Sequence, residues 1–202
     1  MTKAPAPRKR PARRKAATRR VAERPARAAA AHANDTAALA RLMGPDHPVT
    51  RHLGMVRGVM LHVLRAEALS APILGNSQAL IDYLFADMAH LPSERLRVLF
   101  LNAKNRLLRD EVMGEGTISE TPVYPREIMR RALEIGATAL ILVHNHPSGD
   151  PEPSAGDIEA TRRIVDAGRP FDIRIHDHVI VARSGWSSFR TLGLIAGAEH
   201  YG

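Results

Sequence analysis

Two histidines, a serine and an aspartate lie within fourteen residues of one another in this sequence. His144 and His146 end an apolar run, and Ser154 and Asp157 follow at the start of a helical pattern. On a strand, residues i and i+2 project to the same side, so both imidazoles would face one point. Two imidazoles and a carboxylate form a three-ligand set for a catalytic zinc, with the fourth position left for water. The Ser154 hydroxyl would be placed to donate a hydrogen bond to a tetrahedral oxyanion.

The same residues also fit a structural role. Ser154 and Asp157 have the spacing of a helix capping box, which would only stabilise the start of a helix. A His-x-His sequence at a strand end is weak evidence when taken alone. The complete pattern of His-x-His, seven residues, serine, two residues and aspartate is much rarer by chance. We therefore favour the metal site, in which the cap and the ligand roles are compatible.

Composition restricts the classes of protein that the chain can belong to. Its 202 residues are 45% hydrophobic, enough for one ordinary domain with a core. Cysteine is absent, which excludes disulfides, thiolate zinc sites and the cysteine-ligated zinc deaminases. Aromatic residues make up 4%, which argues against a base-stacking platform for single strands. No apolar run approaches the roughly 20 residues that span a bilayer. We expect a cytoplasmic protein without a membrane partner.

The positive charge is concentrated at the N-terminus. Residues 1–33 contain eleven Lys and Arg and one acidic residue, Glu23, a net charge of +10. The other residues contain 18 basic and 20 acidic side chains, a net charge of −2. We expect residues 1–33 to be a disordered basic tail, because they have almost no large apolar side chains. The tail would either make non-specific, salt-sensitive contacts with nucleic acid or act only as a solvated segment. An organelle transit peptide is a less favoured interpretation.

Periodicity and breaking residues predict the secondary structure. Helices are predicted over the following ranges: 35–43, a Thr50 cap to about Leu69, residue 76 or 77 to just before Pro92, Pro125 to Gly136, and Ser154 to about Gly168. Strands are predicted over these ranges: 95–101, 106–112 as the second arm of a hairpin, 138–143 leading into His144, and 171–182 as one strand or a pair. We expect an α/β domain with a central mixed sheet flanked by helices.

The sequence gives less specific expectations for the other histidines and for two aromatic residues. His176 and His178 are expected to share a strand face, where a structural or supporting role is favoured over a second metal pair. Trp186 and Phe189 are expected to pack the C-terminal end. The histidines of the N-terminal half have no ligand spacing and are interpreted as surface or packing residues: His47, His52 and His62.

The spacing of His144, His146, Ser154 and Asp157 resembles the JAMM motif of MPN-domain metalloproteases. The sequence His-Asn-His-Pro-Ser-Gly-Asp at 144–150 is similar to the form seen in the bacterial RadC family. The resemblance extends from about Leu74 to Leu194. It includes the segments 101–107, 116–117, 123–127 and 177–178. It divides the chain into the tail, a short helical region at 34–73 and a metal-hydrolase domain at 74–202.

The resemblance implies a JAMM/cytidine-deaminase-like α/β fold and a zinc-dependent hydrolase. In such proteins the positions of His144, His146 and Asp157 hold the Zn²⁺ ion, and Ser154 matches the motif serine. The catalytic glutamate of the motif lies upstream on a separate strand. Glu94 resembles it best, and three later residues are alternatives: Glu111, Glu115 and Glu120.

The chain departs from the family in two places. RadC proteins usually have an N-terminal helix-hairpin-helix element that binds the DNA backbone, and residues 34–73 have no such Gly-containing hairpin. Asn102 replaces the aspartate common in the Leu-Asp-x-Lys-Asn segment of the family.

The leading hypothesis is a zinc metallopeptidase or isopeptidase that acts on a peptide or isopeptide substrate. The alternative is a non-catalytic binding module in DNA repair that contacts nucleic acid through residues 1–33. Phosphodiester hydrolysis also stays open, because a zinc-bound hydroxide can attack that bond in principle.

Overall fold

The computed structural model describes residues 36–75, 77–116 and 124–195. The helices are α2 (Pro48–Leu69), α3 (Ser77–Met88), α4 (Pro125–Ile135) and α5 (Ala155–Gly168), with 3-10 turns η1 (Ile73–Gly75) and η2 (Arg169–Phe171). The strands are β1 (Arg95–Leu101), β2 (Leu107–Glu115), β3 (Ala139–His146), β4 (Arg174–Ala182) and β5 (Gly185–Ser188). Residues 36–43 are also helical, as predicted. The predicted basic tail lies outside the described residues.

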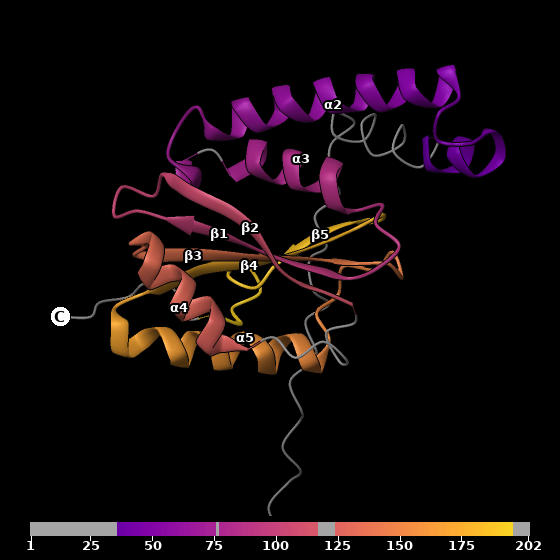
Figure 1. Cartoon of the computed structure of the whole chain (residues 1–202). Coiled ribbons are helices and arrows are strands. Elements are labelled where there is room, and N and C mark those ends of the chain that lie inside the picture. Colours follow the sequence, from indigo (N-terminus) through magenta and orange to yellow (C-terminus); the bar gives the residue numbers. More distant parts are fainter. Residues whose placement is uncertain (1–35, 76, 117–123, 196–202) are drawn as a thin grey trace, which may run out of the picture.

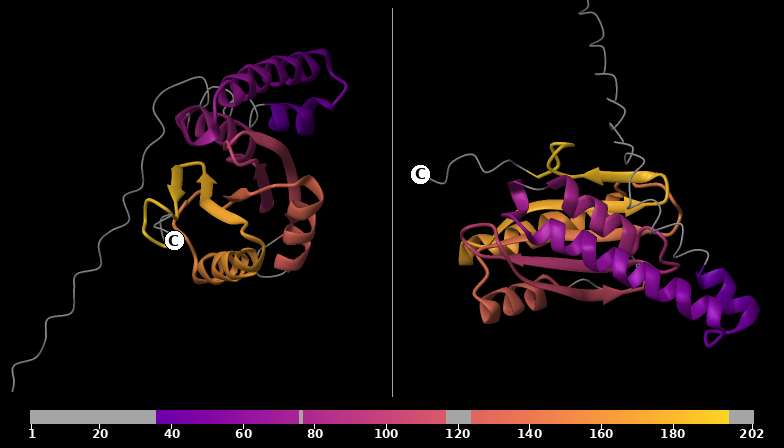
Figure 2. Two further views of the ribbon diagram at one scale, coloured as in Figure 1. Left: turned by 90° about the vertical axis from the view of Figure 1, so that its left-hand side faces the viewer. Right: turned by 90° about the horizontal axis from the view of Figure 1, so that it is seen from above.

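One mixed sheet organises the described part of the chain. Its strand order is β2-β1-β3-β4-β5 (Figure 1). β3 and β4 pair in parallel, and the other three neighbouring pairs are antiparallel. Helix α3 covers one face of the sheet, with α2 packed on its outer side, and α4 and α5 cover the other face (Figure 2). The predicted α/β architecture with a central mixed sheet flanked by helices is confirmed.

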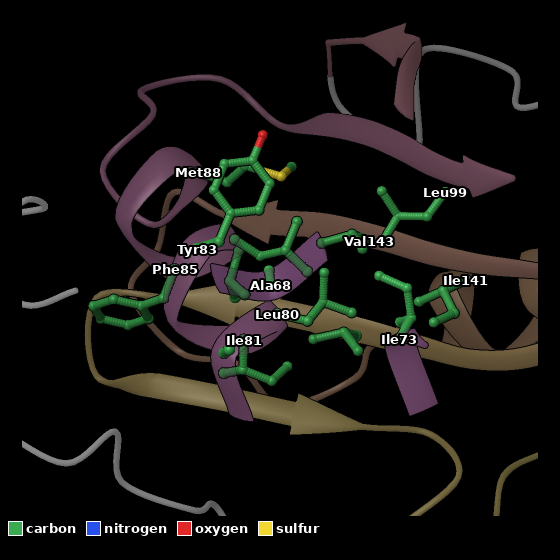
Figure 3. Packing of buried hydrophobic residues seen from close by; sticks show 14 of the residues in the cluster. Ala68, Ile73, Leu80, Ile81, Tyr83, Phe85, Met88, Leu99, Ile141 and Val143 are labelled. Atoms are coloured by element: carbon green, nitrogen blue, oxygen red, sulfur yellow. The ribbon is translucent and has the colours of Figure 1, made fainter. Parts of the chain in front are cut away.

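The sheet separates two apolar cores. On the α3 side, Leu80 belongs to one cluster with Ile141 and Val143 of β3 (Figure 3). On the α4 and α5 side, Leu140 and Leu142 of the same strand belong to the second cluster. Successive side chains of a strand point to opposite faces, so a strand covered on both faces is apolar at every position. This requirement explains the continuous apolar run of β3.

Two element boundaries differ from the prediction. α2 begins at Pro48, and its N-cap is His47, whose side chain accepts a hydrogen bond from the Val49 N–H. Thr50 is therefore not the cap and lies buried in the first turn. Proline is favoured at the first helical position because its missing N–H would have no helical partner there. β2 continues to Glu115, because its pairing with β1 extends across a register shift.

The C-terminal part contains a strand that the sequence pattern did not predict. β5 is only four residues long, Gly-Trp-Ser-Ser, and has no apolar alternation. It forms because a tight turn returns the chain alongside β4, where it pairs in antiparallel register. The predicted packing of the aromatic residues is confirmed: Phe189 is fully buried and Trp186 packs against the α3-side core. Residues 171–182 contain one strand, β4, and not a pair.

None of the described helices is both long enough and apolar enough to cross a membrane.

Candidate metal centre

The candidate ligands meet where β3 ends and α5 begins. β3 and β4 are parallel, and α5 is the helix of the crossover that joins them. His144 lies on the same face of β3 as Leu140 and Leu142, which face the α4 and α5 side. The two histidines of the His-x-His sequence are thus directed toward the N-terminus of α5, as the alternation of a strand requires.

A capping box holds the aspartate at the start of α5. Ser154 is the N-cap residue, and its hydroxyl accepts a hydrogen bond from the Asp157 N–H at 3.1 Å. The Asp157 Oδ2 atom in return accepts from the Ser154 N–H at 2.7 Å and from the Ser154 hydroxyl at 2.6 Å. The predicted capping box is therefore present. It also fixes the rotamer of Asp157, whose side chain is 2% exposed.

Three potential ligand atoms converge at this junction. The Nε2 atom of His144 lies 2.8 Å from the Nε2 atom of His146 and 3.3 Å from Asp157 Oδ1. The Nε2 atom of His146 lies 3.4 Å from Asp157 Oδ2. A tetrahedral zinc with bonds of about 2.0–2.1 Å has ligand atoms about 3.3–3.4 Å apart. The two distances to Asp157 match this spacing, but they join different carboxylate oxygens, and the distance of 2.8 Å between the two nitrogens is shorter. The three side chains together offer nitrogen and oxygen donors of the types that zinc binds.

A hydrogen bond at one ring nitrogen of His146 determines which of its nitrogens is free to bind a metal. His146 Nδ1 lies 2.8 Å from the Asp150 carbonyl oxygen. A carbonyl oxygen only accepts hydrogen bonds, so His146 Nδ1 carries the hydrogen. In the neutral ring Nε2 then has a free lone pair, which is directed at the site. Such a bond from the second nitrogen is usual for histidines that bind metals.

Burial and hydrogen bonding shift the pKa values of His144, His146 and Asp157 in opposite directions. Burial lowers the pKa of His144, and the neighbouring Asp157 only partly opposes this shift. Burial also disfavours a charged His146, but the bonds to Asp157 and to the Asp150 carbonyl raise its pKa overall. Burial alone would raise the pKa of Asp157, yet the bonds from the two histidines lower it well below its usual value. The carboxylate is therefore ionised at neutral pH, as a metal ligand must be.

Glu94 lies beside these residues, just before β1. β1 and β3 are antiparallel, and Leu96, two residues after Glu94, pairs with His144 at the end of their ladder. Leu96 and Val98 pack on the α4 and α5 side, and continuing this alternation back to Glu94 would put it on the same face as the candidate ligands. The charge of Glu94 raises the pKa of both His144 and His146.

The alternative glutamates have other partners or lie outside the described residues. The Glu111 carboxylate accepts hydrogen bonds from Arg131 of α4 at 2.6 and 2.8 Å. Glu115 forms an ion pair with Arg95 at 2.6 Å. Glu120 is not among the described residues. The placement of Glu94 supports its selection over these alternatives, and its role as a base stays a prediction.

Asn145 supports the segment that carries Glu94, and sequence reasoning did not select it. Its side chain is fully buried and reaches sideways from β3 to the chain before β1. Its Oδ1 atom accepts from the Arg95 N–H at 2.9 Å, and its Nδ2 atom donates to the Ser93 carbonyl at 2.9 Å. The residues on both sides of Glu94 are thus held against β3. The available signal was an amide residue between the two histidines at the end of an apolar strand.

The expectation that His176 and His178 share a strand face is wrong. The register of β3 and β4 shifts so that Leu140 pairs with Ile175 and Ile141 pairs with Asp177. The extra residue is His176, whose Nε2 atom contacts Asn105 in the β1–β2 turn. His178 instead lies toward α5, 2.7 Å from His144. A β-bulge of this kind re-aims the side chains that follow it.

The fold and the convergent site define the class of protein. A mixed sheet between helices, with two histidines at a strand end and an aspartate at the following helix start, is the arrangement of a JAB/MPN-type domain. A protein-family model described as a RadC-like JAB domain matches residues 74–194. The chain therefore belongs to the RadC family.

Replacement of Asn145 by alanine is expected to destabilise the fold by about 2–5 kcal/mol, because it leaves the Arg95 N–H and the Ser93 carbonyl without their buried partner. Chemical denaturation measures the free energy of unfolding. Asn102→Ala is the control, because Asn102 also bonds two backbone N–H groups, but in an exposed turn where water can replace it. Its expected cost is about 1 kcal/mol. Equal costs for the two variants would contradict the role assigned to Asn145.

Proposed function

We propose that this protein is a zinc-dependent amide hydrolase, a metallopeptidase or isopeptidase. The observation that carries the proposal is the convergence of His144, His146 and Asp157 beside Glu94. Membership of the RadC family supports it, since the match covers the whole site. Zinc held by these three residues would lower the pKa of a bound water to about 7, which supplies a nucleophile at neutral pH.

The charges of the three ligands suit this chemistry. His144 and His146 bind as neutral groups, and Asp157 contributes one negative charge. A divalent cation in this set keeps a net positive charge, which polarises both a water and a substrate carbonyl. A set with more carboxylates would cancel that charge.

Glu94 is the proposed general base and acid. Its position two residues before Leu96, which pairs with His144, and its influence on both histidines support a carboxylate at the edge of the ligand group. In amide hydrolysis this group takes the proton from the attacking water and passes it to the leaving nitrogen. Asn145 would hold Glu94 in position by bonding the backbone on either side of it.

Ser154 is proposed to stabilise the oxyanion. Its hydroxyl donates to Asp157 Oδ2, and it would have to turn from this bond to donate to a substrate oxygen. Its position at the helix N-terminus adds the favourable dipole of α5 for developing negative charge.

The metal site is tested by the zinc content of purified protein. We expect about one zinc per chain in the unmodified protein, since three protein ligands form a catalytic zinc site. His144→Ala should lose the metal, because it removes a buried ligand. His62→Ala is the control, an exposed histidine of α2 outside the site. Equal zinc content in all three proteins, at any level, would contradict the assigned ligands.

The base assignment is tested by replacing Glu94 with glutamine in zinc-loaded protein. The zinc content should stay the same, and hydrolysis of a peptide and isopeptide library, followed by mass spectrometry, should fall by about 10²–10⁴-fold. Glu111→Gln and Glu115→Gln should retain activity, because both carboxylates are paired with arginines. Full activity in Glu94→Gln, with loss in one of the other two variants, would transfer the role to that residue.

A second function, which the charge distribution favours, is non-specific binding of nucleic acid by residues 1–33. This segment has a net charge of +10, and the rest of the chain has a net charge of −2. Lysine and arginine contacts with phosphates release counterions, so the affinity falls steeply with salt. Such binding is compatible with catalysis at the metal site and would also suit a non-catalytic role in DNA repair.

Deletion of residues 1–33 is expected to abolish DNA retention at low salt. The measurement is fluorescence anisotropy with a labelled duplex over a salt series. Affinity of the full chain should fall by about 10³-fold between 50 and 200 mM salt if six phosphates are contacted. If the shortened chain binds with the same affinity and salt slope, the tail is not the contact.

A further inference from the structure

A chain of buried hydrogen bonds leads away from His144. His144 Nδ1 lies 2.7 Å from His178 Nε2, and His178 Nδ1 lies 2.6 Å from the Thr161 hydroxyl. The Thr161 hydroxyl lies 2.6 Å from the backbone carbonyl of Asp157, one turn earlier in α5. All four residues are 3% exposed or less. This series of hydrogen bonds therefore links two candidate ligands, His144 and Asp157, through buried groups.

The Asp157 carbonyl, at the end of this series of hydrogen bonds, defines which group donates in each of them. A carbonyl oxygen can only accept, so the single hydroxyl hydrogen of Thr161 is donated to Asp157. Thr161 must then accept from His178, which places a hydrogen on His178 Nδ1. A neutral imidazole has one such hydrogen, so His178 Nε2 accepts, and His144 Nδ1 must be the donor. His144 Nε2 is left with a free lone pair at the metal site.

Both rings are in surroundings that favour the neutral form. His178 is 3% exposed and His144 is fully buried, and burial disfavours a charged imidazole. The hydrogen-bond partners of the His178 ring are His144 and Thr161, and neither is a carboxylate that would stabilise a charged ring. A neutral His178 has no second hydrogen that could reverse the bond to His144.

Packing holds the His178 ring in the orientation that its two hydrogen bonds require. The ring stacks on Phe189, with centroids 4.6 Å apart and an angle of 29° between the planes. The His178 carbonyl accepts from the Phe189 N–H at 2.9 Å, and the His178 N–H donates to Asp177 Oδ1 at 2.7 Å. The bulge at His176 is what turns this ring toward α5. The ring is thus held by its neighbours as well as by its two hydrogen bonds.

We propose that Thr161 and His178 are positioning residues that keep His144 in the Nδ1–H tautomer, so that its Nε2 atom is available to a metal ion. The inference rests on the metal site of the proposed function. In the opposite tautomer, His144 Nε2 would carry a hydrogen and could not bind metal. The Nε2 atoms of the two histidines lie 2.8 Å apart and beside the Asp157 carboxylate. A cation between them satisfies this arrangement, and either a proton on His146 or a metal ion can supply it.

The tautomer is tested directly in the full-length, metal-free protein. Nitrogen-15 NMR of the histidine side chains distinguishes a protonated from a bare ring nitrogen. We expect His144 and His178 both to carry the hydrogen on Nδ1. His146 is the internal control, because its Nδ1–H is held by the Asp150 carbonyl and not by Thr161. A hydrogen on His144 Nε2, with His144 Nδ1 bare, would overturn the proposal without any need for a variant.

The consequence for the metal is tested with Thr161→Val and Thr161→Ser. Valine has nearly the same shape without the hydroxyl, whereas serine keeps it. Thr161→Val should lower zinc affinity by about 10–100-fold in competition with a chelator, because partners of metal ligands have effects of this size. Thr161→Ser should restore most of the affinity. Folded Thr161→Val protein with unchanged zinc affinity, or equal losses in both variants, would contradict a role for the hydroxyl.

These measurements separate the proposal from the proposed function. They use no substrate, so a failure of hydrolysis leaves them unaffected. If the unmodified protein binds no zinc, the proposed metal centre fails, and the NMR experiment still decides the tautomer. If Thr161→Val does not fold, the NMR result on the unmodified protein and the zinc affinity of Thr161→Ser decide the question.

Discussion

The structure of the site depends on the position of the Asp157 carboxylate between the N-terminus of α5 and the end of β3. Its Oδ2 atom accepts two hydrogen bonds from Ser154, and its Oδ1 atom faces His144. The capping box therefore defines where the carboxylate lies before any metal binds. Because α5 follows the parallel strand β3, this helix start is brought to the strand end that carries both histidines. A shift of α5 by one residue would remove the carboxylate from the site.

Two sets of hydrogen bonds from buried side chains lie around this carboxylate. Asn145 bonds the backbone on either side of Glu94, across the β1–β3 edge of the site. His178 and Thr161 connect His144 to the backbone of Asp157 on the opposite side. Buried polar groups are costly unless they are paired, and paired ones hold a defined geometry. The apolar cores on both faces of the sheet keep water away from these bonds and so preserve their directions.

Much of the fold and part of the site were predictable from local patterns. The helices, the continuous apolar β3 and the hairpin of β1 and β2 follow from periodicity and from proline and glycine positions. The predicted convergence of His144, His146 and Asp157 agrees with their positions in the structure, because a strand alternates and a capping box has a defined spacing. The N-cap of α2 and strand β5 were missed. One uses a histidine as the cap, and the other exists only through its pairing with β4.

The sequence by itself restricted the candidate ligands to histidine and carboxylate side chains, since cysteine is absent. It also determined the crossover from strand to helix that brings the three candidate ligands together. Only the tertiary structure decided which glutamate lies beside them, because that choice depends on the pairing of β1 with β3, two strands that are far apart in the sequence. The separation of His176 from His178 was likewise decided by a bulge in the pairing of two strands. Pairing register and bulges arise from contacts between distant segments, which leave no periodic signal in either one.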